Sequence, residues 1–211
     1  MTTAKPPARY GAIWERASGR LCSTELHHLR GHDPAPLVAL VYDDGKYPYE
    51  TFDHLVDHSR RARLKVAGAL QRRLFLDENR RCDVLLEEID TANQTPIFED
   101  RGSGARGCRL DESALAEVTV RVLASLDARP NILVLNKFGK AECGGGGTLD
   151  LIARALDLAI PTIVGVPRSN IDAWRGFAGD MGVELEARGD VERWLESVRQ
   201  DRTIDSASQL R

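Results

Sequence analysis

Three apolar runs rich in β-forming residues constrain the fold of this chain more than any other feature. They are LVALVY at 37–42, NILVLN at 131–136 and TIVGV at 162–166. A parallel strand is covered on both faces and has a continuous apolar run, whereas a half-exposed strand alternates apolar and polar residues. Because a helical pattern follows each run, we predict an α/β domain with a mainly parallel sheet between two helical layers.

Residues that favour helix caps stand before the helical patterns. Asp111 precedes Glu112 and an apolar repeat over 115–126, which is the spacing of one buried helix face. The expected caps are Thr51, Asp111, Thr148, Ser169 and Asp190.

A smaller set of strands is expected between the first helix and Asp111. Residues 65–71 are predicted to form a strand, and residues 82–89 and 95–98 an antiparallel pair around a turn that starts at Asp90. The predicted fold class is therefore a three-layer α/β domain with a small antiparallel insert.

The length of 211 residues suits one sizeable core better than two. Residues 1–35 mix Pro, Gly, Arg and His without a sustained apolar period, so we expect an N-terminal extension there. The α/β domain is expected over residues 36–199, and a C-terminal tail over 200–211.

Charge and cysteine content narrow the class of protein. A net charge of −3 gives no general attraction for nucleic acid, and the arginine-rich stretch 60–81 is poor in aromatic residues, so nucleic acid is not an expected partner. No apolar run approaches the ~20 residues that span a bilayer, and residues 1–9 lack the apolar core of a secretory signal. With four widely spaced cysteines, we expect a soluble cytoplasmic protein with reduced thiols and no membrane partner.

The loop over residues 43–49 is the first candidate site. Gly45 and Lys46 lie between a strand and a helix, as a Gly-Lys pair does in a loop that binds phosphate. The match is partial, because Leu40 stands where the first glycine is needed and Tyr47 replaces the hydroxyl residue that would hold Mg²⁺. The phosphate loop is therefore degenerate.

Two carboxylates beside this lysine also bear on phosphate binding. Asp43 and Asp44 would repel a polyphosphate unless a cation intervened, so they are the Mg²⁺ ligands to expect if a nucleotide binds. No other metal is expected. The alternative is that Gly45 permits a tight turn and Lys46 is solvated.

The glycine-rich loop over residues 137–147 is the second candidate site. Asn136, Lys137 and Lys140 bring an amide and two cations to bare backbone at a helix start, where an anion is favoured. Glu142 is the candidate catalytic base or water-orienting group, although a single carboxylate is also typical of a solvated surface. A mobile surface loop would have the same glycine content.

An arginine-glycine segment over residues 100–111 is the third candidate. Arg106 and Arg109 supply forked donors that suit phosphate or another oxyanion. Cys108 between them has the character of a small apolar group, and the roles of Cys108 and Cys143 stay open.

Several longer stretches are distinctive when taken together. They are VAGALQ (66–71), CDVLLEEI (82–89), EDRGSGARGCRLD (99–111), NKFGKAE (136–142) and the run from IPTIVGV to AWRGFAGD (160–180). In these stretches the chain resembles a bacterial domain family of unknown function that is often described as nucleoside-triphosphatase-like. The resemblance covers residues 64–185 and is looser over 37–64.

This resemblance implies a fold related to P-loop nucleoside triphosphatases. The order of parts is also similar to the cancer-related nucleoside-triphosphatases, in which a late strand ends in Asp-Glu-Ile-Gly; residues 136–139 occupy that place here. Since this acidic pair and a complete phosphate loop are both missing, the resemblance implies weak or absent hydrolysis. Members of the family commonly accompany molybdenum uptake and cofactor genes, which implies an oxyanion or a pterin-linked phosphate as ligand.

Three functional hypotheses follow. The first is a protein that binds a nucleotide, phosphate or oxyanion with weak or absent hydrolysis. The second is an active nucleoside triphosphatase in which Asp43 or Asp44 holds Mg²⁺ and Glu142 orients water. The third is a non-enzymatic accessory protein of molybdenum metabolism that binds an oxyanion or a protein partner.

Overall fold

The computed structural model describes residues 34–73, 84–99 and 109–208. The expected extension over 1–35 lies almost wholly outside these residues. Arg106 and most of the arginine-glycine segment also lie outside them.

A seven-stranded sheet forms the centre of the described structure, in the order β4-β3-β2-β7-β8-β1-β9. Its strands are β1 (Leu37–Tyr42), β2 (Val66–Arg73), β3 (Val84–Glu88), β4 (Gln94–Pro96), β7 (Ile132–Leu135), β8 (Thr162–Pro167) and β9 (Gly182–Leu185). Neighbours from β2 to β9 in this order pair in parallel, whereas β3 pairs antiparallel with β2 and β4. A separate antiparallel pair joins β5 (Phe98–Glu99) to β6 (Arg109–Leu110). The predicted parallel core and antiparallel insert are both confirmed.

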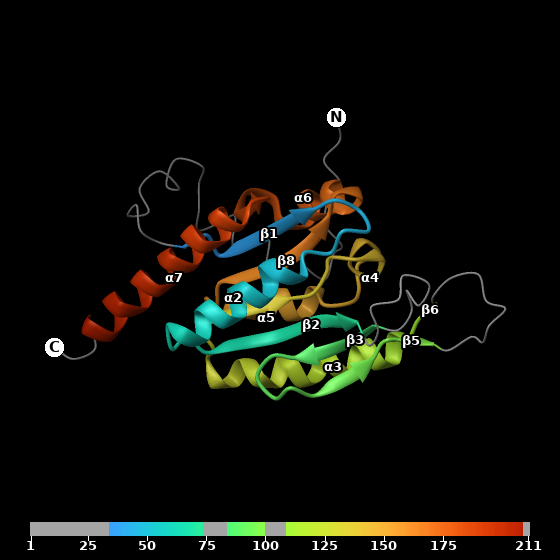
Figure 1. Cartoon of the computed structure of the whole chain (residues 1–211), viewed down its shortest axis with the longest axis horizontal. Helices are drawn as coiled ribbons and strands as arrows, with labels where there is room; N and C mark the ends of the chain where they lie inside the picture. The colour runs from blue at the N-terminus through green and yellow to red at the C-terminus, as the bar shows by residue number, and fades with distance from the viewer. Residues whose placement is uncertain (1–33, 74–83, 100–108, 209–211) are drawn as a thin grey trace.

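Helices cover both faces of this sheet (Figure 1). They are α2 (Tyr49–Arg61), α3 (Glu112–Ser125), α4 (Lys140–Cys143), α5 (Leu149–Asp157), α6 (Ile171–Ala178) and α7 (Arg188–Ser208), with 3₁₀ turns at Leu126–Ala128, Arg168–Asn170 and Gly179–Met181. The side chains of β1 alternate between the two layers. Val38 and Leu40 pack with residues of α2 and α7, whereas Ala39 and Val41 belong to the core formed with α3, α5 and α6. Burial on both faces explains the continuous apolar run of this strand.

The cap prediction is confirmed at α3 and wrong at α2 and α6. The carboxylate of Asp111 accepts from two backbone N–H groups of the first turn of α3, at 3.0 Å each. Helix α2 begins at Tyr49, before the expected Thr51 cap, and Pro48, which has no side-chain acceptor, occupies the cap position. Helix α6 begins after Asn170, because Ser169 lies in a 3₁₀ turn and uses its hydroxyl elsewhere.

The last strand and helix also differ from the sequence expectation. Strand β9 was not predicted, since it lies at the sheet edge beside β1 and its central residues are exposed, which removes the apolar run of a buried strand. Helix α7 begins at Arg188, so Asp190 lies in its first turn and does not cap it. The helix continues to Ser208, past Gln200, where the tail was expected.

The chain leaves the neighbouring strands β1 and β8 in opposite directions. From β1 it crosses over β8 and β7 to reach β2, and from β8 it crosses over β1 to reach β9. In open α/β sheets such a divergence creates a crevice at the carboxyl ends of the two strands. The loops after β1, β7 and β8 lie at this edge, on the side where Figure 1 shows α4.

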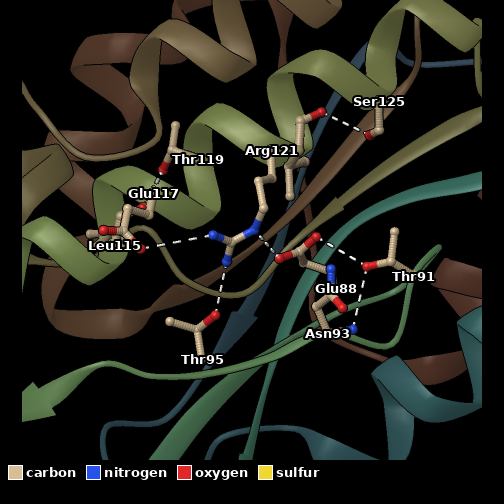
Figure 2. A network of polar contacts seen from close by, with 10 residues as sticks. Glu88, Thr91, Asn93, Thr95, Leu115, Glu117, Thr119, Arg121 and Ser125 are labelled. Carbon is tan, nitrogen blue, oxygen red and sulfur yellow. Dashed lines mark hydrogen bonds and ion pairs between the residues drawn. The ribbon is translucent and has the colours of Figure 1, made fainter.

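A polar network ties α3 to the antiparallel strands, and Figure 2 shows its side chains converging. Glu88 is buried, and its two carboxylate oxygens accept from Arg121 Nε at 2.6 Å and from Thr91 Oγ1 at 3.1 Å. Arg121 Nη2 also donates to Thr95 Oγ1 at 2.9 Å. This network fixes β3 and β4 against α3.

Candidate functional site

The loop after β1 is a tight turn closed by its own residues. The Lys46 N–H donates to the Asp43 carbonyl at 3.0 Å, and Gly45 between them has a φ of +79°, which favours glycine. The Lys46 ammonium lies 3.3 Å from Asp43 Oδ2. The lysine proposed from sequence to meet phosphate therefore contacts a carboxylate of its own turn.

Residues that follow β8 donate hydrogen bonds to both carboxylates of this turn. Arg168 Nε donates to Asp43 at 3.4 Å, and the Ser169 N–H and hydroxyl donate to Asp44 at 3.1 and 2.5 Å. The Lys46 and Arg168 side chains hold the pKa of Asp43 below its usual range. We name these four residues with Lys46 the β1 cluster. Arg168 also donates to Glu186 at 3.1 Å, so Lys46 and Arg168 are already paired with carboxylates of the protein itself.

Tyr47 stands where a phosphate loop would carry a hydroxyl for Mg²⁺. Its ring stacks on Phe52 with centroids 5.4 Å apart and meets Tyr42 and Tyr49 edge-on, so the side chain belongs to the packing under α2. Burial raises the pKa of its phenol well above the usual value, which keeps it neutral. The packing explains why an aromatic residue stands at this position.

The loop after β7 is anchored by the side chain of Phe138. This ring is buried and meets Trp174 of α6 edge-on with centroids 5.5 Å apart, while its backbone N–H donates to Gly165 of β8 at 2.7 Å. Asn170 Nδ2 donates to the Phe138 carbonyl at 2.8 Å. At the strand end, Asn136 Oδ1 accepts from the Gln71 N–H at 3.1 Å. The backbone on both sides of Lys137 is therefore held in place.

Glu142 closes the glycine-rich loop from inside. It is buried, with Oε2 accepting from the Gly139 N–H at 2.7 Å and Oε1 from the Thr148 N–H and hydroxyl at 2.8 and 3.1 Å. A Cβ at Gly147 would lie 2.1 Å from Oε1, which explains a glycine there. The start of α5, where the sequence predicted a bound anion, thus already holds the carboxylate of Glu142.

Replacing this carboxylate tests its part in the loop. Glu142→Gln is expected to lower the free energy of unfolding by about 1–2 kcal/mol, because an amide NH₂ then faces donors that need an acceptor. Urea denaturation followed by circular dichroism measures the change. The control is Asp150→Asn in the exposed first turn of α5, for which less than ~0.5 kcal/mol is expected. Equal stability of Glu142→Gln and the parent would contradict this account.

A pocket of about 380 Å³ lies beside this loop, at the carboxyl ends of β2 and β7. Helix α3, the antiparallel strands and α5 supply mostly apolar lining, and the β7 loop supplies most of the polar part. The polar lining residues are Gln71, Thr119, Asn136, Lys137, Lys140, Glu142 and Thr148.

The structure brings together only some of the residues proposed from sequence. Asn136, Lys137, Lys140 and Glu142 line the same pocket, and Lys137 and Lys140 are exposed. Arg109 lies in β6, next to the lining residue Leu110. Asp43, Asp44, Gly45 and Lys46 do not line the pocket and belong to the turn of the β1 cluster. Arg106 lies outside the described residues.

Sequence reasoning did not identify the apolar lining of this pocket. Leu115, Val118 and Val122 of α3 line it, but the same helical spacing is typical of any buried helix face. Gln71 and Thr119 likewise have no motif that marks them in the sequence.

Three further findings concern metal binding, thiol reactivity and membrane-spanning helices. Within residues 34–73, 84–99 and 109–208, no three His, Cys, Asp or Glu side chains form a group that could hold a metal ion. Partial burial and the nearby charge of Glu142 raise the pKa of the Cys143 thiol, which disfavours a reactive thiolate. None of the helices in these ranges is long and apolar enough to cross a bilayer.

Comparison with known proteins gives one family and one distant relative to consider. A family model with the description "Protein of unknown function (DUF2478)" matches residues 37–194. The molybdenum import ATP-binding protein ModC 2 of Bradyrhizobium diazoefficiens is 32% identical over 169 residues, which cover 77% of this chain and 18% of that protein. No solved structure matches.

Proposed function

Since this chain belongs to the DUF2478 family, whose model spans its α/β core, we propose that this core binds a nucleotide or another phosphate-like oxyanion. The proposed site is the pocket at the carboxyl ends of β2 and β7. The observation that carries the proposal is the position of Lys137 and Lys140 on one anchored loop beside Asn136, all lining that pocket. Two cations at a concave site favour an anionic ligand.

The relative's printed name supports the nucleotide as ligand. That protein is described as ATP-binding, and the chain aligns with a part of it at 32% identity. The chain spans only 18% of its length, so ATP binding is transferred here as a proposal. The proposed pocket lies at the carboxyl edge of the mainly parallel sheet, the edge at which open α/β folds bind ligands.

Weak or absent hydrolysis is the second part of the proposal. In nucleoside triphosphatases, catalysis depends on a cation that bridges phosphate oxygens and on a group that positions water. Here Asp43 and Asp44 already pair with Arg168, Lys46 and Ser169. The carboxylate of Glu142 accepts three hydrogen bonds from its own loop. Both groups would have to exchange protein partners before acting on a nucleotide.

An active nucleoside triphosphatase is the alternative for the same residues. It requires phosphate release from ATP or GTP that depends on Mg²⁺ and disappears in Glu142→Gln at a temperature at which circular dichroism shows the variant to be folded. A malachite green assay of the parent and this variant separates the two proposals, since a binding protein gives only background release in both.

An accessory role in molybdenum metabolism is a second candidate function. It is favoured by the description of the relative as a molybdenum import protein. In this case the lysine pair would bind molybdate or a protein partner in place of a nucleotide. Calorimetric titration with molybdate, tungstate, sulfate, ATP and GTP distinguishes the ligands.

Removing either lysine tests the proposed site. Lys137→Ala and Lys140→Ala are each expected to weaken ATP binding about fivefold, since an exposed ion pair of this kind contributes about 1 kcal/mol. Isothermal titration calorimetry at low salt measures the affinity. The melting temperature should stay nearly unchanged, because both side chains are exposed.

Lys65→Ala is the matched control for this experiment. Lys65 is also exposed, but it precedes β2 and therefore lies at the opposite edge of the sheet. Its replacement should leave the affinity within twofold (about 0.4 kcal/mol). An equal loss in all three variants would indicate general charge attraction and contradict the proposed site.

A further inference from the structure

We propose that the pocket receives the base of a nucleoside phosphate, so that the ligand is a nucleotide and not an inorganic oxyanion. This inference rests on the proposed function, in which an anion binds beside Lys137 and Lys140. It assigns a position to the base of the ligand, in addition to the position of the phosphate. The observations that carry it are the size of the pocket, its lining and the internal contacts that hold α3 and the β7 loop.

The size of the pocket exceeds what an oxyanion needs. Its volume of about 380 Å³ lies within the ~300–1,000 Å³ typical of sites for organic ligands. A tetrahedral oxyanion would occupy a small part of this space beside the lysines and leave the rest unfilled. A nucleoside attached to the phosphate would extend into the remaining volume.

The lining divides the pocket into an apolar interior and a polar side. Leu86 and Ile97 line the pocket together with Leu115, Val118 and Val122 of α3, and these side chains belong to one apolar cluster. An inorganic anion gains nothing there, because charge is costly to move next to apolar groups. A flat heterocycle, in contrast, buries its apolar faces against such side chains.

The polar lining also suits the edge of a base. Asn136 uses its Oδ1 to accept from the backbone of Gln71, which turns its amide nitrogen, a donor, away from that contact. The Thr119 hydroxyl donates to the Leu115 carbonyl at 2.8 Å, so its oxygen can still accept. One donor and one acceptor thus lie in a mainly apolar lining, the arrangement that orients ligands in organic sites.

Two parts of the pocket wall are held by contacts within the protein. The Arg121–Glu88 contact ties α3 to β3, as Figure 2 shows, and Glu142 closes the loop that carries the lysines. A site held in this way loses little conformational freedom on binding.

A substitution on α3 tests the inference. Leu115→Trp places an indole ring, which is larger than the leucine side chain, in the pocket. Val120→Trp places the same ring on the exposed side of the same helix, where Val120 is 65% exposed. In calorimetry with the full chain, Leu115→Trp is expected to weaken ATP binding at least tenfold. Val120→Trp is expected to change it less than twofold. Tripolyphosphate, which has no base, should bind both variants as it binds the parent.

The parent protein alone gives an independent readout if Leu115→Trp fails to fold. ATP is expected to bind it at least tenfold more tightly than tripolyphosphate and more tightly than molybdate. Equal affinity for ATP and tripolyphosphate, or binding of molybdate with no binding of ATP, overturns the inference and leaves an anion site at the lysines. No binding of ATP, tripolyphosphate or molybdate overturns both this inference and the proposed function.

Discussion

Gly68→Ala is expected to destabilise this protein by more than about 4 kcal/mol, which exceeds the effect of most single substitutions. Gly68 pairs with Val134 where β2 meets β7, and a Cβ there would lie 1.8 Å from the Val134 carbonyl oxygen. Its φ of +133° is also strained for any residue with a side chain. Because the obstacle is the backbone of the next strand, a side-chain rotation cannot relieve it.

The measurement is the free energy of unfolding from urea denaturation, together with the yield of soluble protein. Total stabilities of about 5–15 kcal/mol are usual, so a loss of this size leaves many proteins largely unfolded. The control is Gly176→Ala in α6, where an added Cβ would meet no atom within 4 Å. That change is expected to stabilise the protein by up to about 1 kcal/mol. A Gly68→Ala variant with the parent's urea midpoint would show that β2 and β7 pair in another register.

Arg121→Met is expected to cost about 3 kcal/mol of stability. It removes the cation that pairs with Glu88, which is only 2% exposed, and leaves a buried carboxylate with the Thr91 hydroxyl as its remaining side-chain partner among the described residues. The estimate is at the lower end for a broken buried pair, because the Arg121 side chain is 38% exposed and water can reach the site.

Glu117→Gln is the matched control, since Glu117 lies 3.9 Å from the same guanidinium but is 71% exposed. It should change the free energy of unfolding by less than ~0.5 kcal/mol. The double variant Arg121→Met with Glu88→Gln should recover part of the loss, because the uncompensated charge is gone. If Arg121→Met and Glu117→Gln had equal small effects, the buried pair would not support α3.

Much of the fold could be predicted because its signals are local. The runs at 37–42 and 162–166 correspond to β1 and β8, and Asp111 caps α3 as its position before Glu112 suggests. Each of these signals depends on residues within one strand or one helical turn. Strand β9 could not be predicted, because the central residues of this edge strand are exposed and it has no continuous apolar run.

The candidate site was less accessible to sequence reasoning. Lys137 and Lys140 were predicted to bind an anion, and both line the pocket. Lys46 was also predicted to bind the anion. In the structure, its backbone N–H donates to the Asp43 carbonyl and its ammonium contacts the Asp43 carboxylate. A motif gives the type of residue at a strand end but not the partner that the next loop supplies.

The sequence by itself determined most strands, most helices and the parallel character of the core, because burial patterns and caps depend on near neighbours along the chain. Only the tertiary structure decided which charges meet. Ser169 reaches Asp44 across 125 positions, and Arg121 reaches Glu88 across 33. Such contacts depend on strand order and on which helix covers which face. Strand order and helix placement therefore decide that the acidic turn after β1 pairs with Lys46, Arg168 and Ser169, while Lys137 and Lys140 line a mainly apolar pocket.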